Sequence, residues 1–168
     1  MKKMIVVAML LLGFSMQCQI AFGEVKHNQV NFFIDPVASY KEKGLLFGGE
    51  FEAVLNEVYL KLGYTNFMAL DPIYMDAYVC FGANFKAGYF DDFKAFAGIK
   101  YGQIYRQGAP QLYPLFGVEG GLQQYVSEKF AIGCKMSYDW RSDQQFWSEE
   151  MNDVWILSGF VYVTVKLN

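Results

Sequence analysis

The chain has 168 residues and a formal net charge of −3, with 14 Lys and Arg against 17 Asp and Glu. This length predicts one domain, and a mild acidic excess without a basic cluster argues against nucleic acid as a partner. Phenylalanine (16), tyrosine (12) and glycine (16) are abundant, proline (4) is scarce, and stretches with a helical period are hard to find, which favours an all-β protein.

The first 23 residues have the composition of an export signal. Lys2 and Lys3 give a positive start, residues 5–14 form a short apolar run, and Ala21-Phe22-Gly23 places small residues before a cleavage site. The apolar run is too short for a membrane-spanning helix, which needs roughly 20 residues. We therefore expect a signal peptide at 1–23 and a mature domain at 24–168.

Eight extended segments follow in chain order. A tilted strand needs about 9–11 residues to cross a bilayer, and most of the segments are at least this long. They are predicted near 28–35, 45–55, 57–66, 74–86, 92–106, 112–125, 129–141 and 153–167.

The predicted strands have one apolar and one polar face, because side chains alternate with a period of two. In the last segment one parity carries Trp155, Leu157, Gly159, Val161, Val163, Val165 and Leu167. The other parity includes Ser158, Tyr162, Thr164, Lys166 and Asn168. The same parity rule places Cys80 on the inward face and Cys134 on the outward face, so the two are expected not to form a disulfide.

Two further patterns indicate a membrane barrel and not a half-buried soluble sheet. Connections alternate between short turns and longer loops, which is typical of outer-membrane barrels, and the longer ones fall at 36–44, 65–73, 107–111 and 142–152. Aromatic residues fall near both ends of the apolar faces, as in the belts that form at membrane–water boundaries. The predicted aromatic girdle consists of Tyr64, Tyr101, Trp140 and Trp155 near the long loops, and Phe85, Phe93 and Phe130 near the short turns.

This pattern resembles the small eight-stranded outer-membrane barrels of Gram-negative bacteria, the opacity and adhesin-type porin-like proteins. The resemblance covers the whole mature chain and rests on the strand faces and loop lengths. It implies an all-β fold: an eight-stranded antiparallel up-and-down transmembrane β-barrel located in the outer membrane. Members of this family commonly end in an aromatic residue, whereas this sequence ends Lys166-Leu167-Asn168.

Charged residues on the inward faces are the most unusual feature of the sequence. An eight-stranded barrel is only wide enough for its own side chains, so these charges are expected to pair with one another and form a polar plug and not an ion path. The predicted interior polar network is Glu50, Glu52, Lys61, Asp76, Lys94, Lys100, Arg106, Glu119, Lys135, Asp139 and Arg141.

We expect no catalytic site, metal site or cofactor. The only histidine, His27, lies near the predicted short-turn end. Outer-membrane lipid A deacylases and palmitoyl transferases, by resemblance, would need a Ser/His/carboxylate arrangement at the opposite end. Metal-ligand spacings of Cys and His and glycine-rich phosphate loops are also missing from the sequence.

The expected function is therefore that of a non-enzymatic, monomeric outer-membrane barrel that contacts lipid and has an anchoring, adhesive or envelope-structural role. The loop at 142–152 carries Asp143, Phe146 and Trp147 and is a candidate for contact with a surface ligand, although acidic loops are more often simply solvated.

Three alternatives remain: a soluble periplasmic lipocalin-like binding barrel, an outer-membrane lipid-modifying enzyme and a narrow pore. A lipocalin-like barrel needs an apolar interior and a polar exterior. The orientation of Lys94, Lys100 and Lys135 therefore discriminates this alternative from the membrane barrel.

Overall fold

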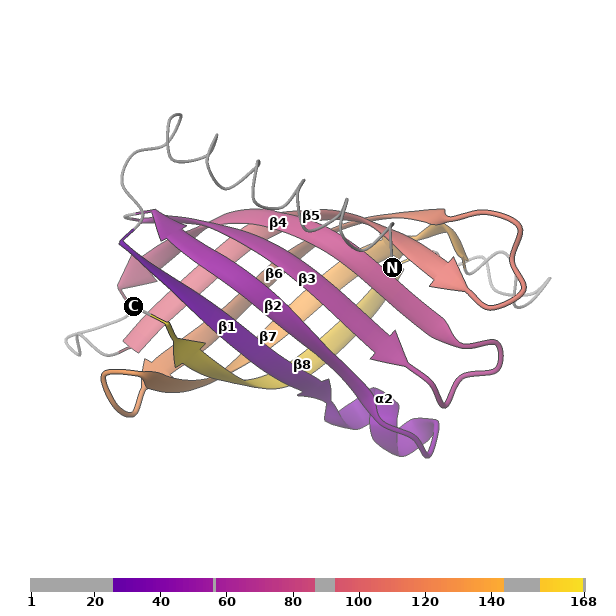
Figure 1. Cartoon of the computed structure of the whole chain (residues 1–168), viewed down its shortest axis with the longest axis horizontal. Helices are drawn as coiled ribbons and strands as arrows, with labels where there is room; N and C mark the ends of the chain where they lie inside the picture. Colours follow the sequence, from indigo (N-terminus) through magenta and orange to yellow (C-terminus); the bar gives the residue numbers. More distant parts are fainter. Residues whose placement is uncertain (1–25, 56, 87–92, 144–154, 168) are drawn as a thin grey trace.

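A computed structural model describes residues 26–55, 57–86, 93–143 and 155–167. The described residues form eight strands that pair in chain order, and the last strand pairs with the first, so the sheet closes into an antiparallel barrel (Figure 1). The predicted up-and-down barrel is confirmed. The predicted signal peptide at 1–23 lies outside the described residues.

The strand boundaries agree with the predicted ranges to within two residues at each end. The strands are β1 (His27–Asp35), β2 (Leu46–Leu55), β3 (Val58–Phe67), β4 (Tyr74–Lys86), β5 (Phe93–Arg106), β6 (Tyr113–Tyr125), β7 (Phe130–Arg141) and β8 (Trp155–Lys166).

The connection between β1 and β2 contains a short helix, α2 (Pro36–Lys41), where the sequence predicted only a loop. Asp35 caps this helix, because its Oδ1 accepts a hydrogen bond from the backbone N–H of Ala38 at 2.8 Å. Pro36 occupies the first turn, where its missing N–H has no cost. Among the described residues, no helix is long and apolar enough to cross a membrane.

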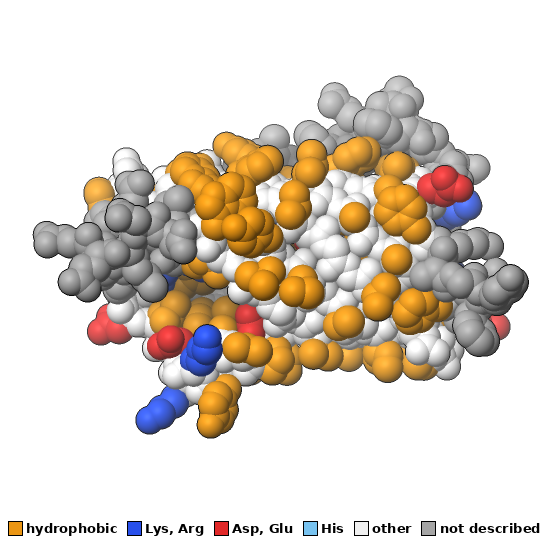
Figure 2. All heavy atoms as spheres, turned by 180° about the vertical axis from the view of Figure 1, so that it is seen from behind, with side chains coloured by type: hydrophobic (Ala, Val, Ile, Leu, Met, Phe, Trp, Pro, Cys, Tyr) orange, Lys and Arg blue, Asp and Glu red, His pale blue; other side chains and the backbone are white. Residues whose placement is uncertain are grey.

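The two faces of the sheet differ as the alternation predicted. In β8 the side chains of Tyr162 and Thr164 are buried inside the barrel, whereas Val161 and Val163 are about half exposed on its outside. Figure 2 shows hydrophobic side chains spread over the middle of one outer face, with charged side chains mainly towards its two ends. Cys80 is buried and Cys134 is exposed, and both are free thiols, as predicted.

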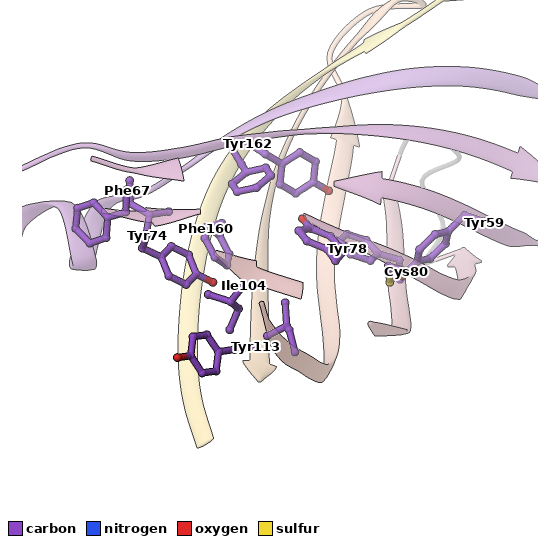
Figure 3. Packing of buried hydrophobic residues seen from close by; sticks show 13 residues of the cluster. Tyr59, Phe67, Tyr74, Tyr78, Cys80, Ile104, Tyr113, Phe160 and Tyr162 are labelled. Atoms are coloured by element: carbon purple, nitrogen blue, oxygen red, sulfur yellow. Dashed lines mark hydrogen bonds between the residues drawn. The ribbon is translucent and has the colours of Figure 1, made fainter. Parts of the chain in front are cut away.

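Aromatic rings fill much of the space enclosed by the strands (Figure 3). The rings of Tyr59, Phe96 and Tyr162 contact edge to face, with centroids 6.0 Å apart for the first pair and 6.3 Å for the second. A Cβ atom at Gly82 would overlap the Tyr59 ring, and one at Gly133 would overlap the Tyr162 ring. Glycines on neighbouring strands therefore make room for the large rings in a narrow barrel.

Candidate functional site

The candidate site is the polar interior of the barrel. Of the eleven residues in the predicted interior network, nine are buried, and Lys94 and Arg141, which lie near opposite ends of the barrel, are half-buried. The strand parity explains this placement, since each residue occupies an inward position of its strand. The contacts divide the network into a central cluster, a group at the long-loop end and a group at the short-turn end.

Lys135 on β7 is the central cation of the barrel. Its ammonium contacts Oε1 of Glu50 on β2 and lies 4.0 Å from Oε2 of Glu119 on β6. The same ammonium lies 3.9 Å from the ring centroid of Phe33. Glu50 Oε1 also accepts a 2.5 Å hydrogen bond from the hydroxyl of Tyr78. Lys135 therefore holds together side chains from strands on different sides of the barrel.

Lys61 on β3 is the second cation of the central cluster. It donates a 2.7 Å hydrogen bond to Glu119 Oε1 and lies 3.9 Å from Glu52 Oε2. Its ammonium also lies over the rings of Phe96 and Tyr59, at 4.1 and 4.5 Å from their centroids. Two lysines thus face three glutamates in the central cluster, with aromatic faces completing the surroundings of both cations.

Neutral side chains that were not part of the predicted interior network complete this cluster. The Asn31 amide nitrogen donates to Glu50 at 3.2 Å and to Glu52 at 3.0 Å. The Asn31 carbonyl accepts a 2.7 Å hydrogen bond from Thr164, which itself accepts one from Gln123 at 2.9 Å. These residues share the inward parity of their strands, and that parity was the signal that could have identified them.

At the long-loop end, Lys100 and Asp139 form a second buried ion pair, with 2.6 Å between Nζ and Oδ2. Ser137 joins this pair, since its hydroxyl accepts from Lys100 and lies 2.8 Å from Asp139 Oδ1. The Tyr74 hydroxyl donates to Asp76 Oδ2 nearby. The interior carboxylates of this end are therefore also engaged by hydrogen-bond donors.

Asp143 closes this end of the network, so the prediction of a solvated acidic loop is wrong at this residue. Its side chain has no exposed surface and accepts from Arg106 Nε at 2.8 Å and from Arg141 Nη2 at 2.8 Å. Both guanidinium groups lie over the Tyr74 ring, at 4.8 and 4.1 Å from its centroid. Asp143 continues the inward parity of Asp139 and Arg141, which was the available sequence signal. The remainder of the loop, residues 144–152, lies outside the described residues.

Replacing Asp143 with asparagine is expected to lower the free energy of unfolding by about 2 kcal/mol at neutral pH, because charge-assisted hydrogen bonds are lost. Burial alone would raise the pKa of Asp143, but the guanidinium groups of Arg141 and Arg106 outweigh this and hold its pKa below the ordinary value. The ionised carboxylate therefore stabilises the fold above the ordinary pKa of about 3.9, and this contribution is lost as the pH falls through the lowered pKa.

Urea unfolding of the wild type and of the Asp143→Asn variant, measured between pH 7 and pH 3, checks this prediction. The difference between the two proteins should be constant near neutral pH and should shrink in the acid range. A difference that does not change with pH would contradict the assigned role of the Asp143 charge.

At the short-turn end, the Tyr125 hydroxyl donates a 2.9 Å hydrogen bond to Gln29 Oε1 across the barrel. The Lys94 ammonium lies 4.9 Å from the centroid of the Tyr125 ring. His27 is the first residue of β1 and also lies at this end. It is therefore at the opposite end of the barrel from the ion pairs of the long-loop end. Within the part of the chain that the structure describes, no group of three or more His, Cys, Asp and Glu side chains could hold a metal ion.

The residues of the predicted aromatic girdle lie on the outer side of the barrel. Tyr64, Tyr101, Trp155, Phe85 and Phe130 are exposed, and Trp140 and Phe93 are half-buried. In the strand register, Tyr101 pairs with Phe116, Phe116 with Trp140, and Trp140 with Trp155. An unbroken row of outward aromatic residues therefore crosses β5 to β8.

Comparisons with known proteins identify the fold through solved structures. No family model matches the sequence, and no curated protein matches it. The N-terminal β-barrel domain of Pseudomonas aeruginosa OprF superimposes with a TM-score of 0.61 at 14% identity, over 85% of this chain and 98% of that domain. The fold is that of the small transmembrane β-barrels.

Two further structures support this assignment. A de novo designed transmembrane β-barrel gives a TM-score of 0.54 at 14% identity, over 86% of this chain and 98% of the design. Neisserial surface protein A gives 0.53 at 13% identity, over 84% of this chain and 96% of that protein. A designed barrel matches this chain about as well as a natural protein does. The structural similarity therefore identifies the architecture, and the function has to be inferred from the residues of this chain.

Proposed function

We propose that this protein is an integral outer-membrane β-barrel without enzymatic activity, which anchors in the membrane and has a structural or adhesive role in the cell envelope. The observation that supports this proposal is the inversion of the two faces. Lys61, Lys135 and Glu50 are at most 3% exposed, whereas Leu157 and Ile99 are 62% and 57% exposed. In water this arrangement would expose a large apolar surface, which monomeric soluble proteins rarely do.

The same inversion argues against the lipocalin-like alternative. Such a barrel needs an apolar lumen for its ligand and a polar outer surface. Here Lys100 and Lys135 are buried inside, and Lys94 lies on the same inward face. Lipid on the outside of the barrel is therefore the partner that fits the surface.

We propose that the interior network is a structural plug. The cations of the central cluster contact carboxylates on β2 and β6, so ion pairs and rings occupy the lumen at its middle. An eight-stranded barrel has little space beyond its own side chains. Packing of this kind favours a stabilising role over conduction of solutes. Among the described residues, the long-loop end also has no serine–histidine pair, since the single histidine of the sequence lies at the other end.

We further propose, from the sequence resemblance, that the protein has the role of the opacity and adhesin-type barrels and that it is a monomer. The outward aromatic residues near the long loops and those near the short turns would lie at the two membrane–water boundaries. A surface ligand would be contacted through the loop at 142–152. The signal peptide at 1–23 stays a prediction that accounts for export.

Fractionation of cells that express the full chain tests the proposed function. We expect the protein in the detergent-soluble outer-membrane fraction, and we expect the folded and boiled forms to migrate differently in gels. Release by osmotic shock with the soluble periplasmic proteins would contradict a membrane location. The measurement is independent of any ligand, so it tests the location before the adhesive role.

A further inference from the structure

The short-turn end of the barrel holds cations that the interior network does not neutralise. Elsewhere in the described lumen each cation of the network has a carboxylate partner: Lys61, Lys100, Arg106, Lys135 and Arg141 all form ion pairs. Among the described residues, no carboxylate lies within ion-pair distance of His27, Lys94 or Lys166. We call the group formed by Lys94, Lys166 and the imidazole of His27 the cationic mouth, and its positive charge at neutral pH comes from the two lysines.

The strand register brings the cationic mouth together. Lys166 on β8 pairs directly with Gln29 on β1, and His27 lies two residues before Gln29 on the same inward face. Lys94 lies over the Tyr125 ring, and the hydroxyl of that ring is bonded to Gln29. The Tyr125–Gln29 bond thus joins the two sides of the barrel beside Lys94 and Lys166.

The electrostatics of this end favour an incoming anion. The charges of Lys94 and Lys166 act on each other and on the imidazole of His27, and Lys26 adds a further positive charge. The carboxylate that acts on Lys94 is Glu52, which is already bonded to Asn31 and lies near Lys61. Among the described residues, the buried Nε2 of His27 has no hydrogen-bond partner, and the side chain of Gln29 is the polar neighbour of the imidazole. Among the described residues, the carboxylate of Glu52 is the counter-charge that acts on Lys94, and it is shared with Lys61. A bound anion would relieve the remaining repulsion between Lys94 and Lys166.

We propose that the cationic mouth is a binding site for a phosphate group. Lys94 and Lys166 would donate to the phosphate oxygens from two sides, and the imidazole of His27 would supply a third contact. Phosphate suits this arrangement because it offers at least two charged acceptor oxygens at neutral pH, both as inorganic phosphate and as a phosphodiester. The group would belong to a soluble phosphate or to an acidic lipid headgroup at the membrane boundary, and both sources present anionic phosphate oxygens.

The test uses the full barrel folded in detergent and inorganic phosphate as the probe, titrated at constant ionic strength against chloride. Backbone amide NMR signals should shift at the starts of β1 and β5 and at the end of β8. The Lys94→Gln/Lys166→Gln variant should bind phosphate about tenfold more weakly, since two charge contacts are lost. The matched control is Lys41→Gln/Lys43→Gln, which removes two exposed charges from the opposite end of the barrel and should leave the affinity unchanged.

If the double variant does not refold, the single variants Lys94→Gln and Lys166→Gln replace it. Each of them should weaken phosphate binding by a smaller factor than the double variant.

Nanodiscs of phosphatidylglycerol and of phosphatidylcholine, prepared without free phosphate, distinguish the two sources of the phosphate group. Shifts at the mouth in phosphatidylglycerol alone support a lipid headgroup, and shifts with inorganic phosphate alone support a soluble ligand. Equal losses of affinity in the mouth and control variants, or shifts spread over all exposed lysines, would overturn the proposal. The detergent measurement needs only a folded barrel, so its result is separate from that of the fractionation.

Discussion

Replacing Lys135 with methionine is expected to lower the free energy of unfolding by about 3–5 kcal/mol, the range found when one partner of a buried ion pair is removed. Lys135 is 3% exposed and contacts Glu50, with Glu119 at 4.0 Å. Methionine fills a similar volume, so the loss reflects charge more than packing. Without this lysine, three central glutamates would face Lys61 alone.

Urea titration of the refolded protein in lipid vesicles measures this loss. The matched control is Lys41→Met, which removes an exposed lysine of α2 outside the barrel wall and should change stability by less than about 0.5 kcal/mol. The Glu50→Gln/Lys135→Met variant should recover part of the loss, because it no longer buries the Glu50 charge without a partner. Equal effects of Lys135→Met and Lys41→Met would show that the central cluster does not stabilise the fold.

The faces of the strands could be predicted from the sequence because the lumen and the outer surface of this barrel make opposite demands. Val161 and Val163 suit an apolar surrounding, whereas Lys135 and Glu50 need polar partners. A shift of one residue in the pairing would move every charge of a strand to the outside. Both faces therefore exclude a shift of one residue, and the strand ranges could be predicted from the alternation.

The partners within the interior could not be predicted in the same way. Lys135 and Glu50 are 85 residues apart in sequence, and Lys61 and Glu119 are 58 apart. Their contacts depend on the closure of the barrel and on which side chains of equal depth face each other across the lumen. Parity places a residue inside, but it does not specify the height of one strand relative to a strand on the opposite wall.

The ends of the strands show a second limit of the alternation. Asp143 keeps the inward parity beyond the last residue of β7 and binds two arginines, although its position among polar loop residues suggested a solvated side chain. The helix α2 follows from local capping by Asp35 and not from any hydrophobic period. Local hydrogen bonds and charge pairs decide the structure at these ends, where the period of two no longer applies.

A substitution on the outer face tests the membrane location at the level of a single residue. Val161 lies near the middle of β8 and is 52% exposed on the outside of the barrel. An arginine near the middle of a bilayer costs roughly 2–4 kcal/mol in a transmembrane barrel, because its charge loses water. We therefore expect Val161→Arg to lower the free energy of unfolding in lipid vesicles by about this amount.

The matched control is Val37→Arg, which introduces the same charge at a similarly exposed valine of α2, beyond the end of β1. This variant should change stability by less than about 0.5 kcal/mol. In a soluble barrel both valines would face water, and the two substitutions would have the same small effect. A large loss at Val161 together with a negligible one at Val37 would therefore indicate lipid around the barrel wall and water around the helix, whereas equal effects would contradict the proposed location.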